Sequence, residues 1–556
     1  MTRRELPSWV APLGVAVALT ALVGWSFVQR WSVLASSPFP LGVDGYFYPI
    51  QLRSLLETGH LQYPASPLAF YLLAPFAAVT DPITGAKLGA AVLGALIALP
   101  AYGVGLELGR RDRGAGLVAA ALATSSAGSM YLTIEFVKNG IGLTVAMTAL
   151  WLVLRAMRSP SRRTAGIAIA GIVLALLTHK MAAGLVLGIA IPAAITEAFR
   201  RGKLRWRRIL PIAVALGILV LLGLVMPERF LSPGDLELIE GLFTTDADWS
   251  LPVRGTLRLG YEPVICAALA IAAAVTSILE QPDRRSRLLL LAIVIQTAGE
   301  LIGIGTLIVS SGLLTWIVTA GGVGLALGGM LLRRRIAKTP GPFTTREGAG
   351  RDVVAWSMIA LGALIALPWL DTSDGQGLAM RLRVIAFVPM AFCGSIVARA
   401  ILRRIEAPRT ILAAALSLGI VMLHAFGTRT EGRTPVHPAL VAAAQVVKIP
   451  DGGVAIVPSR QVAFMIAWYA RATINLRPEP IAEERRYRVL TLNFLGLGSQ
   501  LDAALLEARE DPTSGVVGVH PLHPNGLVIV PEKTWRAIVA KITGVERMRL
   551  DVWPTI

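Results

Sequence analysis

Long apolar runs separated by short polar segments occupy about the first three quarters of the chain. Runs of about 18 to 25 residues are long enough to cross the hydrocarbon core of a bilayer as helices. The chain has thirteen such runs, near residues 10–29, 84–106, 115–133, 140–157, 165–178, 181–198, 209–226, 262–279, 287–306, 312–332, 353–370, 382–401 and 410–427. The pattern therefore predicts a polytopic α-helical membrane protein with about 13 transmembrane helices. The shorter run at 67–79 begins with a proline, which favours an interfacial or re-entrant segment.

The basic residues lie in clusters between these runs. With the N-terminus inside, the inner loops hold 27 Lys and Arg, against 9 in the outer loops before the C-terminal tail. Because cytoplasmic loops carry the excess of positive charge, we expect a multi-pass protein of the cell membrane with a cytoplasmic N-terminus. Counting 67–79 as a full span would place the clusters outside, so we reject that alternative. The alternation puts these segments on the extracytoplasmic side: the first outer loop (30–83) with its juxtamembrane segments, 134–139, 179–180, 227–261, 371–381 and the tail.

The tail changes character at about residue 428. Short apolar runs alternate there with amphipathic ones, which predicts strands at 454–457, 488–492 and 526–530 and helices at 461–471, 499–508 and 533–542. Alternating strands and helices indicate a small α/β domain. We therefore expect a transmembrane domain at 1–427 and a small extracytoplasmic α/β C-terminal domain at 428–556.

Composition narrows the class of protein. The chain is 54% hydrophobic and 16% charged, which does not fit a soluble globular protein. Its net charge of +18 falls in the inter-run clusters, so nucleic-acid binding is not favoured. Both cysteines, Cys266 and Cys393, lie inside apolar runs, which supports neither a disulfide nor a thiolate metal site. The first run has no convincing cleavage site and is interpreted as a retained span.

Asp44 is the leading candidate for a catalytic residue. It lies in the first outer loop with Tyr46, Tyr48 and Tyr63 nearby in sequence. A carboxylate at a membrane face can act as a general base toward a hydroxyl or amine, and tyrosine rings suit a sugar. Alternatively, Asp44 before Gly45 only forms a turn or a helix cap.

Other charged residues on the same side could join this site. Glu135 could face Asp44 while Lys138 binds an anionic leaving group, or the two could pair with each other at a helix start. His179 and Lys180, between two apolar runs, could hold a phosphate, or Lys180 could reach the membrane interface.

Arg381 and Arg383 begin a span on its outer side, against the general charge bias. They are too close along a helix to share a face, so we expect one to face the cavity and the other the headgroups. Glu300, one turn from Gln296 in an apolar run, could line the substrate cavity, relay protons or make an interhelical hydrogen bond.

The spans, the acidic first loop and the outer tail together resemble the GT-C superfamily of membrane glycosyltransferases. The segments VDGYFY (43–48) and YPASPL (63–68) are similar to the first-loop pattern of protein O-mannosyltransferases and aminoarabinose transferases. The resemblance covers the membrane region. It implies an inverting transfer from a polyprenyl-phosphate sugar donor to an extracytoplasmic glycan, lipid or protein acceptor, in contact with membrane lipids.

The resemblance also implies roles for particular residues. Asp44 takes the place of the general base and Glu135 that of the second-loop acid. Phe136 and Val137 follow Glu135 where some members carry a paired acidic motif, so a divalent metal is possible but not favoured, and no metal site is assigned. The donor phosphate would be held by cations from the set Lys138, His179, Lys180, Arg381 and Arg383.

Two other classes of function remain open on the sequence. A transporter would use Gln296, Glu300 and the glycine-rich segment 303–324 as a broken-helix substrate site. A non-catalytic membrane scaffold would keep the architecture without activity. The absence of an obvious repeat and the predicted folded tail favour the transferase.

Overall fold

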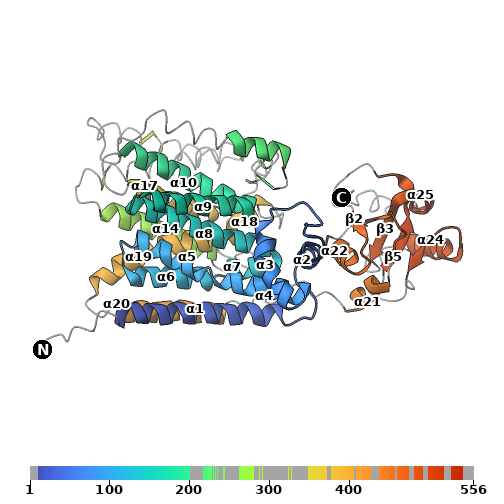
Figure 1. Ribbon diagram of the computed structural model, residues 1–556, viewed down its shortest axis with the longest axis horizontal. Coiled ribbons are helices and arrows are strands. Elements are labelled where there is room, and N and C mark those ends of the chain that lie inside the picture. Colours follow the sequence, from blue (N-terminus) through green and yellow to red (C-terminus); the bar gives the residue numbers. More distant parts are fainter. Residues whose placement is uncertain are drawn as a thin grey trace.

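The computed structural model describes a helical bundle with a small α/β domain at one end (Figure 1). The described residues are 10–200, parts of 217–243, 262–280, most of 349–427, 438–446, 448–457, 460–474, 481–491, 499–518 and 527–542, with a few single residues between them.

The bundle consists of helices that follow the apolar runs of the sequence. They are α1 (Val10–Leu34), α2 (Phe47–Thr58), α3 (Leu68–Val79), α4 (Pro82–Ala95), α5 (Ala98–Leu108), α6 (Arg113–Thr124), α7 (Ala127–Glu135), α8 (Val137–Arg158), α9 (Arg162–Thr178), α10 (Lys180–Arg200), α14 (Glu262–Leu279), α17 (Ala349–Ile365), α18 (Leu378–Val384), α19 (Phe387–Arg404) and α20 (Arg409–Gly427).

Six helical segments are long and apolar enough to cross a membrane, or seven if the bent pair α6 and α7 is one span, among the residues described. The chain is therefore a polytopic membrane protein. The predicted count of 13 is not confirmed. The predicted spans at 209–226, 287–306 and 312–332 lie largely outside the described residues. Helices α9 and α17 have 17 residues each, the lower limit for a crossing helix.

The C-terminal domain is a mixed sheet with helices on both faces. Its elements are α21 (Pro438–Val446), β1 (Val454–Ile456), α22 (Arg460–Tyr469), β2 (Thr473–Ile474), β3 (Arg486–Thr491), α24 (Ser499–Glu510), β4 (Val517–Gly518), β5 (Leu527–Pro531) and α25 (Glu532–Lys541). The strand order is β2-β1-β3-β5-β4, with β1 parallel to β2 and β3, and β5 antiparallel to β3 and β4.

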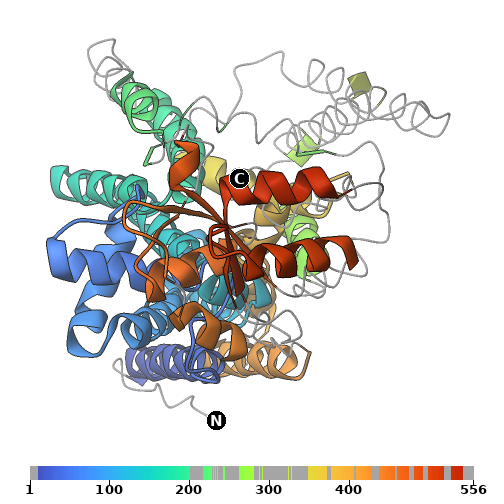
Figure 2. The same cartoon turned by 90° about the vertical axis from the view of Figure 1, so that its right-hand side faces the viewer.

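Alternation along the two central strands gives this sheet its two faces. Val489 of β3 and Ile529 of β5 are paired and join the core that includes α22 and the first loop. Their neighbours Leu490 and Val528 join a second core with α24 and α25. Figure 2 looks onto this domain where it covers the end of the bundle. One face of the sheet is thus directed toward the membrane domain.

Two buried charges from other helices hold α7 in place. The guanidinium of Arg30 on α1 donates to Ser129 Oγ at 2.6 Å and to Thr133 Oγ1 at 3.1 Å. The carboxylate of Glu262 on α14 accepts bonds from Ser126 Oγ at 2.8 Å and from the first backbone amides of α7. A carboxylate at a helix N-terminus satisfies amides that have no partner within the helix. The C-terminal residue of α7, Glu135, therefore has a fixed position.

The same contacts correct one predicted boundary. The sequence predicts that the first span ends at residue 29, before Arg30, but α1 continues to Leu34. The charge of Arg30 does not end the span because its hydrogen bonds are made to α7 inside the bundle.

We expect Glu262→Gln to lower the melting temperature of the purified protein in detergent. The amide nitrogen of Gln would face hydroxyl and amide donors, and a lost hydrogen bond to a buried charge costs about 1.5–3 kcal/mol. The exposed Glu57 supplies the control Glu57→Gln. Equal melting temperatures for the two variants would show that Glu262 does not hold α7.

Candidate functional site

The loop that carries Asp44 (residues 35–46, the Asp44 loop) rests directly on the end of α7. Gly42 has a φ of +86°, and a Cβ there would lie 2.6 Å from the carbonyl oxygen of Ile134. The carbonyl oxygen of Asp44 accepts a bond from the amide of Phe47 at 3.0 Å, just before α2. Asp44 thus lies in a turn. The sequence left a turn open as the alternative to a catalytic role for Asp44.

Glu135 anchors the backbone of this loop. Its Oε2 accepts a hydrogen bond from the amide of Val43 at 2.9 Å, and the residue is only 3% exposed. The first-loop acid and the second-loop acid therefore belong to one site. The contact with Val43 is that of a positioning residue, and a catalytic role for Glu135 stays a prediction.

Three cations surround the carboxylate of Asp44. Arg460 on α22 brings its Nε to 2.8 Å from Oδ1, a close ion pair without the alignment of a hydrogen bond. The positive charges of Lys138 and Arg381 also act on Asp44. Burial raises the pKa of Asp44 above its ordinary value, and these cations oppose that rise without cancelling it. The site thus combines the two largely buried carboxylates of Asp44 and Glu135 with three cations.

Lys138 lies at the centre of this charged group. Its backbone amide donates to Tyr48 Oη at 3.2 Å, and its Nζ lies 5.3 Å from the centre of the Phe47 ring. The charges of Asp44, Arg460, Arg381 and Lys180 all act on it. Segments that the alternation of spans assigns to one side thus meet at one end of the bundle. Which side of the membrane this end faces stays a prediction.

The two arginines of α18 separate as the helix geometry predicts. Arg381 is partly buried and its charge reaches Asp44, Lys138 and His179. Arg383 is 0% exposed and donates to the carbonyl oxygen of Leu367 at 3.4 Å. Its burial differs from the expected position among headgroups. Arg381 is therefore the better candidate for a phosphate ligand.

His179 and Lys180 have protein partners of their own. Lys180 Nζ lies 2.9 Å from both carboxylate oxygens of Asp235. His179 Nδ1 accepts a bond from the amide of Met181 at 3.1 Å. Lys180 also lines a cavity with Leu176, Ala183, Leu187, Leu219, Arg229 and Phe230, and the empty space of this cavity, open solvent included, is about 270 Å³. This cavity is mostly apolar, with two cations on its wall.

Two of the three predicted tyrosines, Tyr46 and Tyr63, contact the C-terminal domain. Tyr46 is buried with its hydroxyl 3.1 Å from that of Tyr469, and Tyr48 is buried beside Lys138. Tyr63 is partly buried and its ring lies against Phe47 and Phe464. These contacts are packing contacts, so a role in substrate binding stays a prediction. Glu300 and Gln296 lie outside the described residues.

The contribution of α22 to this site was not predicted from the sequence. Besides Arg460, Gln461 donates to the carbonyl oxygen of Gly42 at 3.3 Å, and Arg53 of α2 donates to the carbonyl oxygen of Trp468 at 3.0 Å. The predicted helix began at 461, one residue after Arg460. The sequence does contain one indication of this contact. Phe464 and Trp468 lie four positions apart, so both rings lie on one face of α22, and such an apolar face packs against another element.

Among the residues that the structure describes, no group of three or more His, Cys, Asp or Glu side chains could hold a metal ion. The cations around Asp44 would also repel a divalent metal there.

Gly42→Ala is expected to displace the Asp44 loop. A Cβ at Gly42 would clash with the backbone of α7 and meet Glu135 Oε2 at 3.0 Å. Faster hydrogen–deuterium exchange at residues 38–48 measures this displacement. Gly59→Ala is the matched control, because Gly59 also has a positive φ but nothing within 4 Å. Equal exchange in the two variants would show that the clash is relieved at no cost to the loop.

Two solved structures are among those found similar to this chain. No family model matches the chain and no curated protein is similar to it. It is similar to the crystal structure of ArnT from Cupriavidus metallidurans bound to undecaprenyl phosphate, at 15% identity and a TM-score of 0.45, and to ArnT from the same organism in the apo state, at 18% and 0.41. Each similarity covers 93% of this chain and 98% of that chain. At TM-scores below 0.5 these similarities do not establish a common fold.

Proposed function

We propose that the chain is a membrane glycosyltransferase that moves a sugar from a polyprenyl-phosphate donor to an extracytoplasmic acceptor. The observation that carries the proposal is the buried carboxylate of Asp44 among Lys138, Arg381 and Arg460. Glycosyl transfer from a lipid phosphate needs a base for the acceptor and positive charge for the departing phosphate. The site supplies both groups at one end of the bundle.

The proposed reaction is a single displacement. The Asp44 carboxylate takes a proton from an acceptor hydroxyl or amine, whose oxygen or nitrogen attacks the anomeric carbon. The bond between that carbon and the phosphate oxygen breaks, and its electron pair leaves on the lipid phosphate. Lys138 and Arg381 stabilise the charge that develops there. Attack opposite to the leaving group inverts the anomeric configuration.

The cavity beside Lys180 supports a place for the donor lipid. Its apolar wall suits a polyprenyl chain, and Lys180 and Arg229 on the same wall could contact a phosphate. The charge of Lys180, on the wall of the cavity, acts on Lys138, and the charge of Lys138 acts on Asp44. The cavity is therefore electrostatically coupled to the carboxylate. Asp235 balances part of the charge of Lys180, so Lys138 and Arg381 are the principal phosphate ligands in this proposal.

Arg460 has a separate role. Its ion pair holds the carboxylate of Asp44 in the charged form that a base requires. The Arg460 side chain is 48% exposed on α22 and could therefore also contact the acceptor. The C-terminal domain therefore supplies part of the site in addition to covering it.

Asp44→Asn is expected to reduce sugar transfer by at least about 100-fold, the lower end of the contribution of a general base. Transfer of radiolabelled sugar from polyprenyl-phosphate donors in membranes measures it, and undecaprenyl phosphate is the first lipid carrier to test. Asp81→Asn is the control, since Asp81 caps α4 through Ile83 and Thr84 and asparagine is an equally good cap.

Full activity in Asp44→Asn would show that another residue is the general base. A wild-type protein that transfers no sugar but carries a solute into vesicles would instead identify a transporter.

The pH dependence of transfer tests the pair with Arg460. Asp44 must be ionised to accept a proton, so kcat/KM falls as the pH drops through its pKa. Burial raises this pKa and Arg460 lowers it, so Arg460→Gln must raise it further. We expect the acidic limb of the kcat/KM profile to move to higher pH in this variant. Arg509→Gln, an exposed change in the same domain, should leave the profile in place, and a shift of equal size there would refute the pairing.

A further inference from the structure

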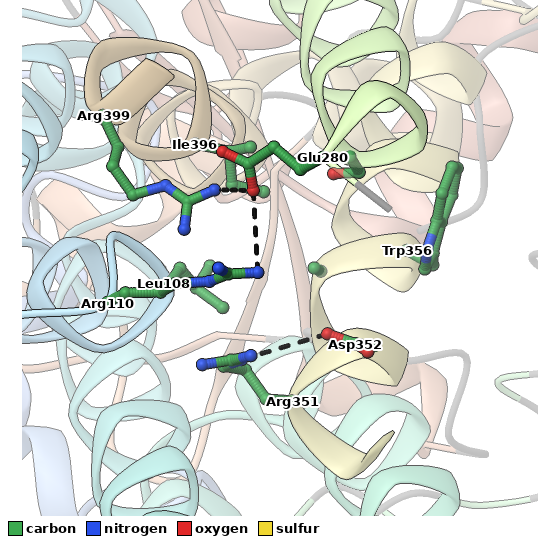
Figure 3. A pocket seen from close by; sticks show the side chains of 10 residues that line it. Leu108, Arg110, Glu280, Arg351, Asp352, Trp356, Ile396 and Arg399 are labelled. Atoms are coloured by element: carbon green, nitrogen blue, oxygen red, sulfur yellow. Dashed lines mark hydrogen bonds and ion pairs between the residues drawn. The ribbon is translucent and has the colours of Figure 1, made fainter. Parts of the chain in front are cut away.

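A second charged cavity lies at the other end of the bundle, away from the Asp44 loop. It opens where α5, α14 and α19 end and α17 begins, with a volume of about 540 Å³ that includes its mouth. Arg110, Arg351 and Arg399 line it together with Glu280 and Asp352, and these five residues define the arginine pocket (Figure 3). The positive-inside rule assigns this end to the cytoplasm.

Arg399 is the buried cation of this pocket. Its side chain is 3% exposed, and its Nη2 pairs with Glu280. Its Nε and Nη1 are also buried, yet they have no hydrogen-bond partner among the described residues. Leaving donors of a buried charged group unsatisfied is costly. Arg399 thus keeps N–H donors for an acceptor that the described residues do not provide.

The charges in the pocket favour an anion. Arg110 shares the Glu280 carboxylate with Arg399, at 3.6 Å, and Arg351 lies 3.9 Å from Asp352. Two carboxylates therefore face three guanidinium groups. The charges of Arg110 and Arg403 act unfavourably on Arg399, and the charge of Asp112 acts favourably. An anion in the pocket would relieve the repulsion between the arginines and accept a hydrogen bond from Arg399.

The remaining wall suits a molecule at the membrane surface. Trp356, Ile396 and Leu108 line the pocket beside the arginines, and tryptophan is enriched at the level of lipid headgroups. Basic pockets between helices on the cytoplasmic side are typical sites for phosphate headgroups.

We propose that the arginine pocket binds a phosphate group, and that an anionic phospholipid headgroup supplies it. The guanidinium of Arg399 can donate an unsatisfied N–H, at Nε or at Nη1, to one phosphate oxygen, while Arg110 and Arg351 face the remaining oxygens. The lipid anchors the cytoplasmic ends of α5, α14, α17 and α19 to one another. This site is independent of the proposed transferase activity.

Lipid binding to the purified, delipidated full-length protein tests the proposal. Melting temperature in a neutral detergent is titrated with phosphatidylglycerol, with phosphatidylcholine of the same acyl chains, and with inorganic phosphate. We expect phosphatidylglycerol to stabilise the wild type, with a half-saturating concentration about tenfold or more higher in Arg399→Gln, since a hydrogen bond to a charged group is worth roughly that factor.

Matched variants keep the result interpretable. Arg351→Gln changes a partly exposed side chain of the pocket and should weaken phosphatidylglycerol binding even if Arg399→Gln fails to fold. Arg404→Gln removes the same charge from an exposed position near the end of the same helix and should bind as the wild type does. Unchanged binding in Arg351→Gln, or equal stabilisation by phosphatidylcholine, would overturn the proposal. Saturation by inorganic phosphate at the same concentration would overturn the lipid as its source.

Discussion

A charge buried inside a bundle of apolar helices must find its partners within the protein, and here two such charges meet on α7. Arg30 and Glu262 reach this short helix from α1 and α14 and fix its position. Glu135, the last residue of α7, therefore also has a fixed position. Its carboxylate accepts a hydrogen bond from the amide of Val43 and so positions the turn that contains Asp44. The position of the candidate base thus depends on contacts made in the middle of the bundle.

Most of the site could be predicted from the sequence because it follows from the alternation of spans. That rule brings Asp44, Glu135, Lys138 and Arg381 to one end without any knowledge of their contacts. The break between α6 and α7 was not predicted, although the small polar residues Thr124, Ser125 and Ser126 interrupt the run at 115–133 and serine is a favoured helix N-cap. Its two helices are bent by 46° at Ser125 and Ser126, where a carboxylate distant in sequence captures the new N-terminus.

Contacts between distant segments explain what else was missed. Nothing near Lys180 in the sequence indicates that Asp235 balances its charge, and nothing near Asp44 indicates Arg460. Helix spacing separates Arg381 from Arg383 but does not say which of them is buried. The two ends of the bundle also differ in their buried charges. One end holds the carboxylate of Asp44 among cations. The other holds the guanidinium of Arg399, whose Nε and Nη1 have no hydrogen-bond partner among the described residues.

The pairing of the Asp44 loop with α22 also sets an order in time. Tyr46 and Tyr469, whose hydroxyls meet, are 423 positions apart. At a synthesis rate of about 5–20 residues per second, roughly 20 to 85 s pass between the appearance of the two. During that interval the first loop is already at the membrane surface, but Asp44 has no Arg460 beside it. The site therefore becomes complete only when nearly all of the chain has been made, so a nascent or truncated polypeptide lacks the arrangement that the finished protein has.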